Sequence, residues 1–366
     1  MLLTLVTRFK PGDTGVQIVI SRSSVSIAVV LLGALGSAGA QQVERPLFES
    51  HAPLELTIEG PFRALSRDGE ERPERDGLVR YLDAQGDEVV LDVAIRIRGN
   101  SRVEICSFNP LRLNFKRGQV GGTLFAGQNQ LKLVTLCKRG ASYRDYLAQE
   151  YQTYRAYNAL TDRSFRVRWL TVNYVETGGR RPSSFTEHAF LIEEDWEVAE
   201  RHGMEVVEVE SLTLPELDPQ ATALLAVFQF MTGNTDWSGT SGPPGEDCCH
   251  NGAVMAPPGS GQLRVLVPYD FDQSGLIDTE YALPSDGLGI RSVTQRLYRG
   301  YCSANQELDW AIQHVNERRA QVLSAFESDL VSERAKRRAV GYLSESYEII
   351  NDAERMRSDI VERCRG

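Results

Sequence analysis

Four polar residues in the central part of the chain are of the types that bind magnesium and phosphate. Asp236 follows an apolar run, Asn251 follows a loop rich in glycine and proline, and Asp270 follows a second, shorter apolar run. Asp272 adds a carboxylate two positions further on. Carboxylates hold Mg²⁺, an amide oxygen completes its shell, and one carboxylate is left to orient a nucleophile. The spacing therefore predicts a metal–phosphate site at the ends of several elements.

A cationic partner for the phosphates is expected from the preceding part of the chain. Lys132 lies in a predicted strand and Glu150 in the predicted helix that follows it. Protein kinases use a strand lysine paired with a helix glutamate to hold nucleotide phosphates. Lys116 and Arg112 are alternatives for the same role. Arg98 either supports the edge of the sheet or reaches the phosphates.

Hydrophobic periodicity predicts the elements that must position these residues. Alternation with period two predicts strands, and apolar residues spaced by three and four predict helices. The predicted strands are 54–59, 78–82, 89–97, 111–115, 131–136, 165–175 and 189–192. The predicted helices are 143–160, 195–201, 218–231, 305–328, 332–347 and 350–364. This order predicts a bilobal, kinase-like α+β fold, in which an antiparallel β-rich lobe with one inserted helix (54–200) precedes a helical lobe (201–366) that carries the site.

The first forty residues have the pattern of a secretory signal. Basic residues precede the apolar run Val25–Leu35, and Ala38-Gly39-Ala40 supplies a small-residue cleavage site. We therefore expect residues 1–40 to be a signal peptide and 41–53 a tail. The protein would then be exported to the periplasm or the extracellular space.

Composition excludes some classes of function. Of 366 residues 25% are charged and 42% hydrophobic, which is ordinary for a globular protein. The net charge of −10 argues against a nucleic-acid binder, because neutralising phosphates needs a basic face. No apolar run after residue 40 is long enough to predict a membrane span.

The cysteine count is even, which in an oxidising compartment permits disulfides. The six cysteines are Cys106, Cys137, Cys248, Cys249, Cys302 and Cys364. Cys106 and Cys137 are the preferred pair, because each borders an apolar, strand-like run. The remaining connectivity is left open.

Three short motifs resemble the CotH (spore-coat protein H) family of secreted atypical kinases. They are Arg96–Ser101, the turn Asn234-Thr235-Asp236, and Pro268–Asp272. The resemblance implies a kinase-like fold, ATP with Mg²⁺ (or Mn²⁺) as cofactors, and a protein serine or threonine as acceptor. It also implies that Asp236 is the catalytic aspartate and that Asn251 and Asp270 bind metal.

The sequence leaves a non-catalytic alternative open, in which the protein is an envelope or surface binding module. Two features favour it: no Gly-x-Gly-x-x-Gly loop is present, and Ser238–Cys249 lengthens the interval between Asp236 and Asn251. A calcium-stabilised structural protein is a third possibility. The sequence has no Gly-x-Ser-x-Gly elbow and no His-Glu-x-x-His motif, which disfavours hydrolase and zinc-protease chemistry.

Overall fold

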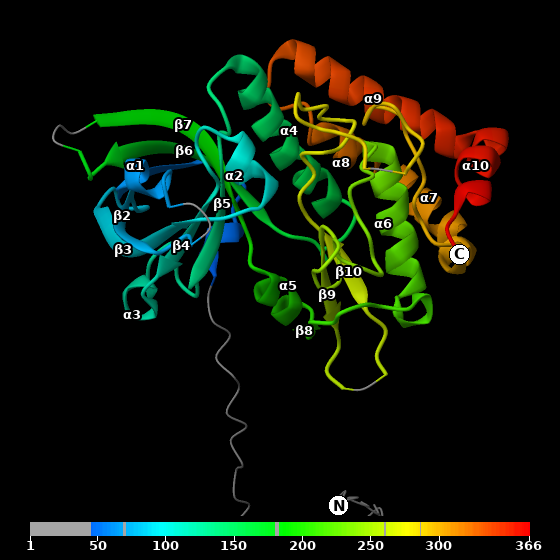
Figure 1. Cartoon of the computed structure of the whole chain (residues 1–366), viewed down its shortest axis with the longest axis horizontal. Coiled ribbons are helices and arrows are strands. Elements are labelled where there is room, and N and C mark those ends of the chain that lie inside the picture. The colour runs from blue at the N-terminus through cyan, green and yellow to red at the C-terminus, as the bar shows by residue number, and fades with distance from the viewer. Residues whose placement is uncertain (1–44, 69–70, 180–182, 260, 286) are drawn as a thin grey trace, which may run out of the picture. The chain divides into compact units, whose positions relative to one another are not determined.

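The strands in the first half of the chain close into a barrel (Figure 1). The computed structural model describes residues 45–366, apart from 69–70, 180–182, 260 and 286. Burial alternates along strands such as β1, where Leu56 and Ile58 are buried, so that one apolar face of the strand turns inward. The barrel strands are β1 (Leu54–Gly60), β2 (Arg75–Leu82), β3 (Glu88–Ile97), β4 (Leu111–Phe115), β5 (Gln130–Thr135), β6 (Val167–Glu176) and β7 (Ser183–Ile192).

The predicted bilobal, kinase-like fold is wrong. The barrel order is β1-β2-β3-β4-β5-β7-β6, and β1 closes it by pairing in parallel with β6 from Leu54↔Leu170 to Gly60↔Glu176. In the described part of the chain, this closed, mixed barrel and ten α-helices replace the antiparallel β-rich lobe and helical lobe that were expected. Alternation locates strands but does not say which edges pair, and this pairing joins segments far apart in the sequence.

One long helix covers the outside of the barrel. In α4 (Ala141–Asn158), Tyr151 packs on Trp169 of β6 and Phe190 of β7, with ring centroids 5.3 and 5.9 Å apart. Strand β6 is therefore buried on both faces: Trp169 faces α4, whereas Leu170 faces the barrel interior. This packing fixes the position of α4, which carries Glu150 and Tyr154.

The second half of the chain combines helices with a small sheet. Asp218 is the N-cap of helix α6 (Pro219–Thr232): its Oδ1 accepts a hydrogen bond from the amide of Ala221 at 2.8 Å, and Pro219 takes the first helical position. The sheet has the order β10-β9-β8 and consists of β8 (Glu205–Val206), β9 (Gly252–Ala256) and β10 (Val265–Pro268). The other helices here are α5 (Asp195–Arg201), α7 (Leu308–Glu317), α8 (Arg319–Ser324), α9 (Glu333–Asn351) and α10 (Ala353–Asp359). The short helices of the first half are α1 (Phe62–Leu65), α2 (Ser101–Ile105) and α3 (Arg117–Val120).

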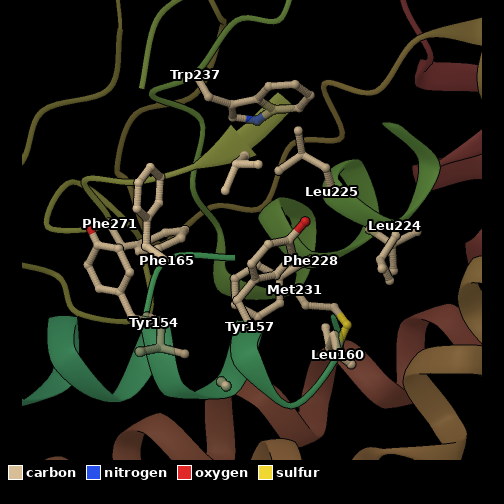
Figure 2. Close-up of a cluster of buried hydrophobic side chains, with 14 of the residues drawn as sticks. Tyr154, Tyr157, Leu160, Phe165, Leu224, Leu225, Phe228, Met231, Trp237 and Phe271 are labelled. Carbon is tan, nitrogen blue, oxygen red and sulfur yellow. The ribbon is translucent and has the colours of Figure 1, made fainter. Parts of the chain in front are cut away.

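A second hydrophobic core lies outside the barrel, between α4, α6 and the small sheet (Figure 2). Tyr154 contacts Phe271 edge-on at 4.9 Å, and Phe228 of α6 lies 5.9 Å from Phe271. Phe271 and Trp237 are 0% and 1% exposed. Each directly follows a predicted site aspartate, Asp270 or Asp236, so the backbone of each aspartate is anchored by a buried ring.

The predicted disulfide Cys106–Cys137 is confirmed, and it joins the end of α2 to the end of β5. Cys302–Cys364 and the neighbouring pair Cys248–Cys249 are the other bridges. None of the helices in the described part of the chain is both long and apolar enough to cross a bilayer. The signal-peptide prediction concerns residues 1–40, which lie outside the described residues.

Candidate functional site

The turn that carries Asp236 is set by the end of α6. Gly233 ends the helix at a φ of +64°, and a side chain there would collide with the hydroxyl of Tyr342. Oδ1 of Asn234 then accepts a hydrogen bond from the amide of Asp236 at 3.0 Å, which closes a tight turn. Asn234 is 1% exposed, whereas Asp236 keeps 26% of its side chain exposed. Buried contacts therefore hold the turn in place, and the Asp236 carboxylate remains partly accessible to solvent.

The Ser238–Cys249 segment folds back, so that Asp236 and Asn251 meet. Ser238 and His250 form an antiparallel bridge, in which the amide of Ser238 donates to the carbonyl of His250 at 3.1 Å. Nδ2 of Asn251 donates to Oδ2 of Asp236 at 2.9 Å and to its backbone carbonyl at 2.7 Å. The long interval between the two residues is therefore a closed loop and does not separate them.

The β9–β10 hairpin brings Asp270 to the same place. Gly252 pairs with Pro268, so Asn251 enters the hairpin beside the point where Tyr269 leaves it. The amide of Tyr269 donates to the carbonyl of Asn251 at 3.1 Å. Asn251 and Asp270 both have left-handed backbones, with φ of +52° and +60°, a conformation that Asn and Asp tolerate better than most residues. The amide of Asp270 donates to the hydroxyl of Tyr154 at 2.9 Å, which ties it to α4.

Glu150 is paired with an arginine, not with the predicted lysine. Nη2 of Arg102 donates to Oε2 of Glu150 at 2.7 Å and to Oδ1 of Asp270 at 3.2 Å, and its Nε donates to Oδ2 of Asp272 at 2.9 Å. The Glu150 and Asp272 side chains are 4% and 6% exposed, whereas Asp270 is 45% exposed. Arg102 therefore holds three carboxylates together, and only Asp270 faces solvent to a large extent.

Lys132 belongs to a different pair. Its ammonium forms an ion pair with Asp195 at the start of α5, and it lies 5.1 Å from the ring centroid of Phe165 and 5.9 Å from that of Tyr269. The predicted Lys132–Glu150 pair is therefore not formed, because each residue has another partner of opposite charge. The contact with Tyr269 still places Lys132 beside the residue that precedes Asp270.

Arg98 is the cation whose surroundings best match the predicted site. Burial lowers the pKa of Arg98, whereas the neighbouring Asp270 carboxylate raises it. Among the described residues, no hydrogen bond or ion pair of the Arg98 side chain is present. Of the alternatives, Arg112 donates to Oε2 of Glu194 at 2.6 Å, and Lys116 forms an exposed pair with Asp92 at 3.3 Å. Arg98 and Lys132 thus provide positive charge next to Asp270 and Tyr269.

The carboxylates of the site are crowded. Burial, followed by the charge of Asp272, raises the pKa of Asp270 to about 6, although Arg102 and Arg98 oppose the rise and solvent reaches the exposed part of the side chain. Burial also raises the pKa of Glu150 to about 8, against the opposing effect of Arg102 and with the help of Asp272 and Asp270. Asp236 is close enough to add to the rise at Asp270. An added cation would relieve this repulsion.

The polar side chains at the site suit a metal ion that is bound together with phosphate. Within the described ranges, no group of three or more His, Cys, Asp and Glu side chains is placed to hold a metal ion. Asp236, Asn251 and Asp270 offer two carboxylates and one amide. Mg²⁺ is commonly held by one or two carboxylates, with water and substrate phosphates completing its shell. These three side chains therefore fit a metal ion shared with phosphate and water better than a metal ion held by protein ligands alone.

Two residues of the site have little or no local signal in the sequence. Nε2 of His250 lies 2.8 Å from Oδ1 of Asp236, and this hydrogen bond raises the pKa of His250. The only sequence signal for His250 was its place next to Asn251. Arg102 directly follows the Arg96–Ser101 motif, but its three partners come from distant segments and no local pattern identifies them.

No protein-family model matches the chain, and no curated protein matches it. These comparisons neither support nor oppose the resemblance to the CotH family. The chemistry of the site therefore rests on the positions of its own residues.

Proposed function

We propose that the protein is an exported, metal-dependent phosphotransferase that transfers the γ-phosphoryl group of ATP to a serine or threonine hydroxyl of a protein. One observation carries the proposal: Asp236, Asn251 and Asp270, which come from three separate turns, converge beside the cation Arg98. The short motifs that resemble the CotH family contain Asp236, Asp270 and Arg98. The proposal does not depend on a kinase-like fold, because chemistry resides in the site and not in the architecture.

Each residue has a distinct role in the proposed transfer. Asp236 orients the acceptor hydroxyl and accepts its proton as the bond from that oxygen to the γ-phosphorus forms and the bond from the γ-phosphorus to the β,γ-bridging oxygen of the leaving ADP breaks. Asn251 and Asp270 would hold a magnesium ion, which would neutralise charge on the phosphates. Arg98 and Lys132 bind phosphate oxygens. Asp272 and Glu150 stay in the buried pair with Arg102 and support Asp270 from behind.

The test is transfer of label from γ-labelled ATP, with Mg²⁺ or Mn²⁺, to the purified chain itself and to dephosphorylated casein. We expect labelling by the wild-type chain and by Asp92→Ala, a matched control on the exposed surface of the barrel. Asp270→Ala should give no label. Equal labelling by Asp270→Ala, or no labelling by the wild type with either metal, would overturn the proposal.

A second candidate is a non-catalytic binding protein. The observation that favours it is that both carboxylate oxygens of Asp236 already have partners, His250 and Asn251. Thermal unfolding separates the candidates. If Mg-ATP raises the melting temperature and Asp270→Ala removes the rise, the protein binds nucleotide; if neither Mg-ATP nor Mn-ATP has an effect, the non-catalytic candidate is favoured.

A further inference from the structure

A half-buried arginine lies behind the turn that carries Asp236. The guanidinium of Arg299 donates through Nη1 to the carbonyl of Thr235, the residue before Asp236. Burial lowers the pKa of Arg299 to about 10, the neighbouring Arg365 adds to this effect, and the Asp236 carboxylate opposes it. Arg299 therefore contacts the turn through its backbone and interacts with the aspartate through its charge.

A second arginine packs against the residue that follows Asp236. The guanidinium of Arg365 lies 4.7 Å from the ring centroid of Tyr301 and 5.6 Å from that of Trp237, the residue after Asp236. The hydroxyl of Tyr301 accepts a hydrogen bond from the amide of Gly239 at 2.9 Å. The residues on both sides of Asp236 in the sequence therefore contact the segment 299–302 and Arg365.

The two arginines are themselves held together. Nε of Arg365 donates to the carbonyl of Arg299 at 2.7 Å, and the amide of Arg365 donates to the carbonyl of Gly300 at 2.9 Å. The amide of Cys302 donates in return to the carbonyl of Arg365 at 2.8 Å. The disulfide between Cys302 and Cys364 joins the same two segments covalently, although these cysteines are 62 positions apart in the sequence.

We propose that Arg299 is a positioning residue that fixes the orientation of Asp236, and that the Cys302–Cys364 disulfide keeps Arg299 in place through Arg365. The inference rests on the proposed function only in assigning Asp236 a part in the transfer. A displacement of about 1 Å at a reacting group costs roughly 100-fold in rate. A substitution of Arg299 should therefore slow the transfer by displacing Asp236, although Arg299 itself does not contact the nucleotide in the proposed reaction.

The test compares Arg299→Met and Arg299→Lys with Arg80→Met, a matched control that removes an arginine paired with Glu59 on the barrel. Kinetics and amide hydrogen exchange are both measured. We expect Arg299→Met to lower kcat about 10- to 100-fold with little change in KM for Mg-ATP. Exchange in residues 234–240 should become faster, while exchange in barrel strands β2–β4 stays unchanged. Arg299→Lys should be intermediate, because it keeps the charge but loses the planar guanidinium.

A second variant tests the covalent part of the proposal. The double substitution Cys302→Ala/Cys364→Ala should also speed exchange in residues 234–240, whereas Cys106→Ala/Cys137→Ala should not. Unchanged exchange in 234–240 for both Arg299→Met and the Cys302/Cys364 pair would overturn the proposal, as would equal acceleration throughout the barrel. If the wild type transfers no phosphate but Arg299→Met still speeds exchange there, the proposed function fails and the positioning of Asp236 stands.

Discussion

Nη2 of Arg102 donates a hydrogen bond to Oε2 of Glu150 at 2.7 Å, and both side chains are nearly buried. The glutamate of α4 is thereby joined to Arg102 of α2, the short helix that follows barrel strand β3, and through Arg102 to Asp270 and Asp272. A kinase-type strand lysine is not part of this arrangement. The pair therefore links α2, the covering helix α4 and the turn that carries Asp270 and Asp272 into one charged cluster.

Removing Arg102 should destabilise the protein strongly. Above pH 8, where Glu150 is ionised, Arg102→Met would leave the Glu150 and Asp272 carboxylates buried without a cation, which costs about 3–5 kcal/mol for a buried ion pair. Urea unfolding measures the loss. The double substitution Arg102→Met/Glu150→Gln should recover part of it. Arg357→Met, which breaks an exposed pair with Glu362, is the control and should change the unfolding free energy by less than about 1 kcal/mol.

The pH dependence of the unfolding free energy should report the raised pKa of Glu150. Burial raises its pKa from 4.5 to about 8, so the folded protein binds this proton more tightly than the unfolded chain does. The resulting stabilisation is present below pH 4.5 and is lost as the pH rises towards 8. Unfolding free energies measured across this interval should fall less steeply in Glu150→Gln than in the wild type. An unchanged slope would contradict the assignment.

His250 should titrate above the usual range for histidine. Its hydrogen bond to Asp236 raises its pKa above 6.5, the ordinary value. The stabilisation that this contact gives is fully present below pH 6.5 and disappears as the pH rises through the higher, folded value. Titration of the ring protons by NMR measures the shift. Asp236→Asn should lower the pKa of His250, and no change on that substitution would show that the contact is not formed in solution.

If the protein binds Mg-ATP as proposed, Arg98 should contribute more to the affinity than Lys132. Lys132 is already paired with Asp195, whereas Arg98 lies next to Asp270 without a partner among the described residues. A charge-assisted hydrogen bond to phosphate is worth about 1.5–3 kcal/mol, so Arg98→Met should weaken Mg-ATP binding roughly 10- to 100-fold. Calorimetric titration measures the affinities of both variants. A larger loss in Lys132→Met than in Arg98→Met would restore the lysine to the predicted role.

The Cys106–Cys137 bridge should contribute to global stability. It closes a loop across a separation of 31 residues, for which loop entropy predicts about 3–4 kcal/mol. Cys106→Ser/Cys137→Ser should lower the urea midpoint, and the reduced wild type should behave similarly. Equal midpoints for the oxidised wild type and the variant would show that the bridge does not stabilise the fold.

Local patterns in the sequence determined most of the elements. The predicted strand 111–115 and helix 195–201 match β4 and α5, and Asp218 caps α6 as expected. Ser142, whose residue type suits an N-cap, instead lies inside α4, because the helix begins at Ala141 and its N-cap is Gly140. These features depend on side chains only a few positions apart, so alternation and capping rules suffice to find them.

Only the tertiary structure decided the closure of the barrel and the partners at the site. The β1–β6 pairing and the contacts of Arg102 with Glu150, Asp270 and Asp272 join segments far apart in the sequence. Their formation depends on which surfaces pack together, and no local pattern records that choice. The residue types at Asp236, Asn251 and Asp270 predicted a shared site; the fold-back of 238–249 and the β9–β10 hairpin are what bring them together.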